Sequence, residues 1–202
     1  MVAAPDDARF MPRLTGPARL ALATLAGLLN GASFIWLGPL ALIANVPLLC
    51  ALWGSRSATR AAALAGLVGV LGGVHIYGIL DYGTWILIAF SLYTGSQMVI
   101  YGLLMRALWG RLGAVFDVAL PALVWTLTEW LRSVGPLSMP ASYVGNVVDV
   151  GVFAPWLALA PITGGLGVST VIALVGSVVW HLAFVGRSHR TPALIAAGLI
   201  AL

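Results

Sequence analysis

The stretch AVFDVALPALVWTLTEWLR, residues 114–132, is an almost continuous apolar run that ends in a charged pair. At about 1.5 Å per residue, a helix of this length nearly spans the ~30 Å hydrocarbon core of a bilayer. The run therefore predicts a membrane-spanning helix. Glu129 and Arg132 are three residues apart, so they share a helix face and are expected to pair. Trp125 lies on the same face, four residues before Glu129.

The composition of the whole chain agrees with a membrane location. Of its 202 residues, 61% are hydrophobic and only 8% are charged, whereas soluble domains carry about 25% charged residues. The net charge of +4 is too small and too scattered for a nucleic-acid surface. The single cysteine, Cys50, excludes an intramolecular disulfide and is interpreted as a buried structural thiol. No cluster has metal-ligand spacing, so we expect neither a metal nor another cofactor.

Further apolar runs predict an all-α polytopic membrane protein. Six runs are long enough, or nearly so, to cross the bilayer: 18–35, 37–53, 61–80, 84–105, 114–131 and 158–185. A seventh begins at Pro192 and reaches only about halfway across by Leu202, so the chain is expected to end inside a membrane helix. The predicted fold thus has six complete transmembrane helices plus the start of a seventh. A cytoplasmic segment, 1–17, precedes the transmembrane domain, 18–202.

The arginines predict the orientation of these helices. If the N-terminus is cytoplasmic, nine of the ten arginines lie on the cytoplasmic side, as the positive-inside rule expects. The cytoplasmic connections are then 54–60, 106–113 and 186–191. Arg132 alone lies on the outer face, where it precedes a connection, 133–157, that is long for a membrane hairpin.

Two interpretations of the charged pair remain open. In the first interpretation the element is an interfacial anchor. Trp130 then lies at the level of the lipid headgroups, and Glu129 and Arg132 neutralise each other at the membrane–water interface. As a site, Glu129 and Arg132 form the floor beneath the long outer-face loop and bind a lipid or a lipidated substrate. Long loops with few charges are often functional, which supports the second interpretation.

Other polar and small residues have simpler expected roles. Asp117 is expected to pair with Arg111 or Arg106, and His75 to make an interhelical hydrogen bond rather than to relay protons. Glycines in the third and sixth runs are interpreted as sites of close helix packing: Gly66, Gly69, Gly72, Gly73, Gly164, Gly165, Gly167 and Gly176.

Three stretches, in this order, resemble the bacterial apolipoprotein N-acyltransferases. SFIWLGPLALIANVPLLCAL, 33–52, is similar to the short first hairpin of that family, with its aromatic-Gly-Pro turn and its Pro-containing second helix. PALVWTLTEWLR, 121–132, resembles the fifth helix of the family. LALAPITGGLGVSTVIALV, 157–175, resembles the segment that re-enters the membrane. The resemblance covers roughly residues 18–202.

The resemblance implies a two-part enzyme of the bacterial inner membrane. Its helices hold the lipid substrates, and an outer-face nitrilase-like domain follows the seventh helix. There a Glu-Lys-Cys triad moves an acyl chain from a phospholipid, through the cysteine, to the N-terminal amine of a lipoprotein. This chain contains no lysine, and Cys50 lies near the predicted cytoplasmic face. We therefore expect the chain to supply membrane anchoring and lipid and substrate binding only, with no catalytic residue and without the catalytic domain.

By position, Glu129, Trp130 and Arg132 match the element at the active-site mouth of the family. Pro140 and Gly145 match a loop where the family commonly shows Pro-Trp and a Gly-Tyr-Ser-like turn. Here alanine and asparagine follow them, so the loop aromatic is missing and Tyr143 is its candidate replacement. This departure leaves the acyl acceptor open. A non-catalytic membrane scaffold and a small transporter remain the alternative functions.

Overall fold

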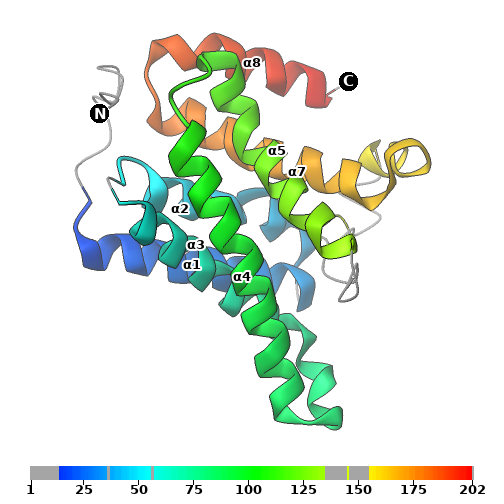
Figure 1. Ribbon diagram of the computed structural model, residues 1–202. Helices are drawn as coiled ribbons and strands as arrows, with labels where there is room; N and C mark the ends of the chain where they lie inside the picture. Colours follow the sequence, from blue (N-terminus) through cyan, green and yellow to red (C-terminus); the bar gives the residue numbers. More distant parts are fainter. Residues whose placement is uncertain (1–13, 36, 56, 135–144, 146–154, 202) are drawn as a thin grey trace.

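The computed structural model describes residues 14–35, 37–55, 57–134, 145 and 155–201. All regular secondary structure in these residues is helical, which confirms the predicted fold class. The elements are α1 (Gly16–Ile35), η1 (Gly38–Leu40), α2 (Ala41–Leu52), α3 (Ala58–Gly73), η2 (Val74–Tyr82), α4 (Thr84–Leu108), α5 (Ala114–Ser133), α7 (Ala160–Phe184) and α8 (Arg187–Ala201). In Figure 1, η2 and the start of α4 extend below the other helices.

Five helices in this part of the chain are long and apolar enough to cross a membrane: α1, α3 with the start of η2, α4, α5 and α7. The expected second crossing, 37–53, instead contains the 12-residue helix α2 preceded by the short turn η1. A 12-residue helix is about 18 Å long, which is short of the ~30 Å hydrocarbon core. The expected count of six complete transmembrane helices is therefore not confirmed.

Helix α8 begins earlier than its apolar run predicts. It starts at Arg187, so most of the expected connection 186–191 is helical and Pro192 lies inside the helix. Proline removes one backbone hydrogen bond from a helix interior. Tertiary contacts hold this turn in place, since His189 and Ala193 are 6% and 0% exposed. The helix packs against α5 and α7, as Figure 1 shows.

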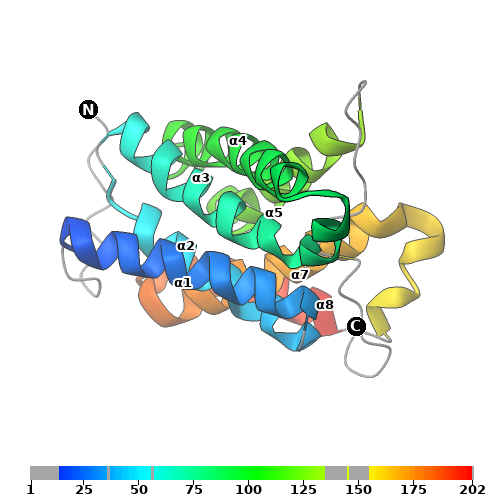
Figure 2. The same cartoon turned by 90° about the horizontal axis from the view of Figure 1, so that it is seen from below.

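Small residues bring α3 and α4 into close contact along their length, and the two helices lie side by side in Figure 2. A Cβ atom on Gly69 would lie 2.5 Å from Thr94 O, and one on Gly73 would lie 2.6 Å from Thr94 Oγ1. Thr94 Oγ1 in turn donates to Gly69 O at 2.8 Å. The predicted role in close helix packing is confirmed for Gly69 and Gly73. It is wrong for Gly164, where a Cβ atom would meet nothing within 4 Å and the positive φ of 67° marks a kink in α7 instead.

Polar and aromatic contacts bring several helix termini together. Near the start of α1, Arg19 donates from Nη1 to Ala51 O at 2.5 Å and to Trp53 O at 2.7 Å. The rings of Trp53, Trp109 and Trp180 lie 4.9 to 5.0 Å apart between centroids. We call this end of the bundle, where α1 begins and α2, α4 and α7 end, the Arg19 end. The expected connections after these helices therefore share one end of the bundle, as the arginine pattern predicts.

At the Arg19 end, Asp117 has partners that the sequence does not suggest. Its Oδ2 lies 3.3 Å from His189 Nε2 on α8, and its Oδ1 accepts a hydrogen bond of 2.9 Å from Gly110 N. The rings of His189 and His181 stack at 5.6 Å. The expectation of an arginine partner for Asp117 is not confirmed, because a histidine 72 residues away approaches it instead.

Replacing Arg19 by methionine is expected to lower the free energy of unfolding by about 2 kcal/mol. Methionine fills much of the same space but leaves the carbonyls of Ala51 and Trp53 without their charged donor. Thermal unfolding in detergent measures the effect. The exposed Arg190 provides the matched control, and equal shifts for Arg19→Met and Arg190→Met would contradict this role.

Candidate functional site

The last turns of α5 carry a buried charged pair. Trp125 Nε1 donates to Glu129 Oε1 at 2.9 Å, and Arg132 Nη2 lies 3.4 Å from the same oxygen. Helical spacing alone places these three side chains on one face. The predicted pairing of Glu129 with Arg132, and the shared face with Trp125, are both confirmed. We call this end of the bundle the Glu129 end.

The burial of the pair is not what an interfacial anchor requires. The Glu129 side chain is 1% exposed and that of Arg132 12% exposed, so the carboxylate is enclosed by helices rather than placed where water begins. Trp130, by contrast, is 48% exposed and does not line the cavity beside Glu129. Trp130 therefore fits the role of a lipid-facing residue, whereas the charged pair is enclosed within the bundle.

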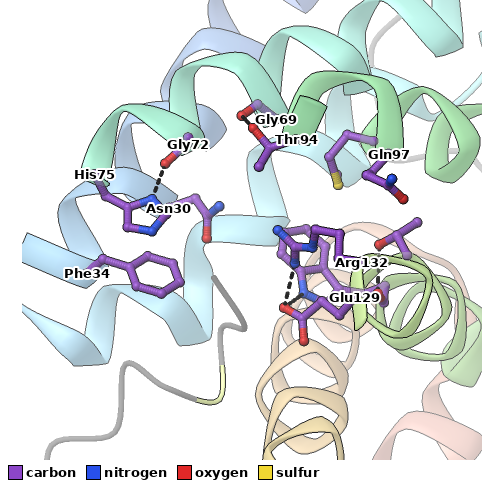
Figure 3. A pocket seen from close by; sticks show the side chains of 13 residues that line it. Asn30, Phe34, Gly69, Gly72, His75, Thr94, Gln97, Glu129 and Arg132 are labelled. Atoms are coloured by element: carbon purple, nitrogen blue, oxygen red, sulfur yellow. Dashed lines mark hydrogen bonds and ion pairs between the residues drawn. The ribbon is translucent and has the colours of Figure 1, made fainter. Parts of the chain in front are cut away.

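Beside this pair lies a small polar cavity, shown in Figure 3. It has a volume of about 20 Å³, which is room for about one water-sized group. Side chains from α1, η2, α4 and α5 line it, among them Asn30, Phe34, His75, Gln97, Glu129 and Arg132. The cavity thus joins residues that are up to about a hundred positions apart in the sequence.

His75 is fixed in the cavity wall by contacts with its neighbours. Its Nδ1 lies 2.6 Å from Gly72 O, and its ring stacks on Phe34 at a centroid distance of 4.1 Å. The expected hydrogen bond to a neighbouring membrane helix is not confirmed, because the described partner of Nδ1, Gly72 O, lies only three residues earlier, at the end of α3. Contact between helices is made by the stacked rings instead.

The remaining candidate residues lie away from the cavity or outside the described residues. Gly145 is buried and its amide donates to Ser169 Oγ on α7 at 2.8 Å, so it packs against the bundle. A Cβ atom there would lie 3.0 Å from Ser169 N, so the contact requires a small residue. Pro140 and Tyr143 lie outside the described residues, as does most of the loop 133–157.

Asn30 and Gln97 are the cavity residues that sequence analysis missed as site residues. Each is an isolated amide in a helix that is otherwise strongly apolar. Polar groups are expensive inside a membrane helix unless a partner or a ligand satisfies them. Because of this cost, an amide side chain in an apolar helix is a sequence signal for a polar site. A search limited to ionisable residues does not find Asn30 and Gln97.

No metal centre is indicated in the part of the chain that the structure describes, where no group of three His, Cys, Asp or Glu residues is close enough to hold an ion. Cys50 is buried in α2 and is not a cavity residue. The chemistry of the cavity is therefore that of hydrogen bonds and of one ion pair.

The fold and this site define a polytopic α-helical membrane protein with a charged polar cavity at one end of its bundle. The model of the family described as apolipoprotein N-acyltransferase N-terminal domain matches residues 26–178. The chain belongs to this family, and the matched region contains every residue named above as lining the cavity. No curated protein matches the chain.

Proposed function

We propose that this chain is the membrane domain of an apolipoprotein N-acyltransferase-like enzyme, which transfers an acyl chain from a phospholipid to the N-terminal amine of a lipoprotein. The buried Glu129–Arg132 pair beside a polar cavity carries the proposal, together with the family match. In this role the helices anchor the enzyme and bind the polar parts of its substrates. Acyl transfer itself belongs to a catalytic domain outside these residues.

The energetic cost of the pair supports a role in binding. Removing a carboxylate and a guanidinium from water costs several kcal/mol, which their mutual attraction only partly offsets. The rest of the bundle packs through apolar side chains and through the glycines of α3 and α4. Packing alone therefore does not require the charges at Glu129 and Arg132, whereas recognition of a polar substrate group does.

The size of the cavity limits what can enter it. A volume of about 20 Å³ admits a terminal polar group and excludes a whole lipid. The acyl chains then remain in the bilayer, against apolar side chains that the helices expose, such as Leu92 and Leu123 at 60% and 52%. A substrate whose polar group lies in the cavity and whose acyl chains stay in the bilayer suits an enzyme that acts at the membrane surface.

The orientation follows from the arginines. We propose that the Arg19 end faces the cytoplasm and that the Glu129 end lies at the outer face of the bacterial inner membrane. In this proposed arrangement the five long apolar helices cross the membrane, while α2 preceded by η1 supplies a shorter segment between the faces and α8 is the start of a further helix. Exposed aromatic side chains support an interface near the Glu129 end, since Tyr82 and Trp85 at the η2–α4 turn are 77% and 70% exposed.

An acyl-transfer assay tests this function. Membranes containing the full-length product of the gene are given a phospholipid with a labelled acyl chain and a synthetic lipopeptide with a free N-terminal amine. Label is expected to appear on the free-amine lipopeptide and not on its N-acetylated form. Absence of transfer would contradict the proposal, and uptake of a labelled solute into proteoliposomes would favour a transporter instead.

A further inference from the structure

The segment that leads into α7 is apolar, uncharged and covered by the bundle on one side only. Residues 155–163, which we call the arm, have the sequence PWLALAPIT. Trp156 and Ala160 are partly buried and pack against the core. Leu159 and Ile162, by contrast, are 36% and 83% exposed. The arm therefore has one side on the bundle and one apolar side that is exposed in the described part of the chain.

The arm leaves α7 at a bend that depends on the backbone of Gly164. Its φ of 67° and ψ of −174° lie in a region that residues with a Cβ atom rarely adopt. A Cβ atom there would meet nothing within 4 Å, so side-chain packing does not explain the glycine. The glycine is needed for the direction of the arm, and in Figure 2 the yellow segment turns away from the direction of α7.

A second glycine fits the bent arm and is not needed by a straight helix. A Cβ atom on Gly167 would overlap Thr163 Oγ1, whereas residues four apart in a regular helix keep their Cβ atoms about 5–6 Å apart. The arm also has hydrogen bonds of its own. Thr163 N and Oγ1 both donate to Leu159 O at 2.9 Å, and Trp156 Nε1 donates to Ile200 O in the last turn of α8 at 3.2 Å. The bent arm is thus a structured part of the fold.

The length of α7 places the bend at one face of the membrane. The C-terminal end of this helix lies at the Arg19 end, where Trp180 packs against Trp53 and Trp109. Residues 165–184 form about 30 Å of helix, which is about the thickness of the hydrocarbon core. A straight helix that began at Ala160 would exceed this thickness by about 8 Å and would carry apolar side chains into water. The bend therefore lies near the headgroups at the opposite face.

The surroundings of the arm favour lipid as the partner of its exposed side. The arm adjoins a membrane-spanning helix, so lipid is present at the level where its apolar side is exposed. Tyr82 and Trp85, 77% and 70% exposed, mark the same face of the membrane at the η2–α4 turn. An apolar segment at this level gains free energy by lying along the interface with its exposed side in the acyl-chain region.

We propose that the arm is an interfacial segment whose partner is the lipid surface. It lies in the plane of the membrane, with Leu159 and Ile162 against lipid and Trp156 against the bundle. The bend at Gly164 lets the rest of α7 cross the hydrocarbon core at a matching length. The arm fixes the depth of this face of the bundle in the membrane, and this role does not depend on acyl transfer.

Spin labels measure the depth of the arm in the full-chain protein. Cys50→Ala removes the single native cysteine, and a label at Ile162→Cys is studied in vesicles of phosphatidylethanolamine and phosphatidylglycerol. Electron paramagnetic resonance compares collisions of the label with O₂, which concentrates in lipid, and with a nickel chelate, which stays in water. We expect the label to lie about 5–10 Å into the boundary between headgroups and acyl chains. Leu92→Cys on α4 is the control for lipid, and the exposed Arg111→Cys is the control for water.

Two results of this measurement would overturn the proposal. Collisions at residue 162 that match those of the Arg111→Cys control would place the arm in water. Slow collisions with both reagents would show that another part of the protein covers the exposed side of the arm.

Gly164→Ala tests the bend without adding a steric conflict, because a Cβ atom there has open space. The variant favours a continuous helix, so a label at Leu159→Cys is expected to move toward water by up to about 8 Å. Gly198→Ala is the matched control, since its Cβ atom also meets nothing within 4 Å and its φ is not positive. This control is expected to leave the depth unchanged. An unchanged depth in Gly164→Ala as well would overturn the role of the bend.

Discussion

Glu129→Gln is expected to lower acyl transfer by the full-length enzyme about tenfold at limiting substrate, because the helices bind the substrate and do not carry out the bond making. The amide can still accept a hydrogen bond from Trp125, but it leaves Arg132 as a buried charge without its counter-ion at 3.4 Å. Breaking one partner of a buried ion pair costs about 3–5 kcal/mol of folding free energy, so the rate is expressed per folded molecule, and the loss that remains reflects the changed charge and hydrogen bonding beside the cavity. The rate of label transfer per folded molecule measures the effect.

Asp117→Asn supplies the control for this prediction, because Asp117 is also a buried carboxylate, 3% exposed, but lies at the Arg19 end. Its transfer rate per folded molecule is expected to remain near that of the wild type. If Glu129→Gln also kept a near-wild-type rate, the charged pair would be a membrane anchor, and the site interpretation would be lost.

Gly69→Val is expected to lower the free energy of unfolding by about 3 kcal/mol or more. A Cβ atom at this position would lie 2.5 Å from Thr94 O and 2.8 Å from Gly95 Cα, and both of these are backbone atoms that cannot move without separating α3 from α4. Overpacking of this kind costs about 1–3 kcal/mol and more where the backbone must shift. Equilibrium unfolding in mixed detergent measures the loss.

Gly198→Val is the matched control on α8, where a Cβ atom would meet nothing within 4 Å. This substitution is expected to change stability by less than about 1 kcal/mol, in line with helix propensities alone. Similar losses for the two variants would show that the close contact between α3 and α4 has no special importance for folding.

The parts of the fold that the sequence predicts well depend on short-range patterns. Apolar runs locate α1, α4, α5 and α7 because crossing a bilayer requires about 20 apolar residues in succession. Glu129, Arg132 and Trp125 could be placed together because i, i+3 and i, i+4 spacing fixes a helix face whatever surrounds it. The arginines predict which helix termini share an end of the bundle, since the chain reverses direction at each crossing.

The parts that the sequence does not predict depend on contacts between distant residues. Helix α8 begins before Pro192 because His189 and Ala193 are packed against other helices, which no local pattern reveals. The cavity likewise exists only once Asn30, His75 and Gln97, from three separate segments, face Glu129. Helical periodicity gives the faces of one helix and does not say which neighbouring helix each face meets.

The most direct test of the account is a cryo-electron microscopy structure of the full-length gene product in lipid nanodiscs with the free-amine lipopeptide or phosphatidylethanolamine bound. The account predicts substrate density at the Glu129 end, with a polar group of the substrate in the cavity beside the Glu129–Arg132 pair. Substrate density confined to the Arg19 end, or to the outside of the bundle with the cavity closed, would contradict it.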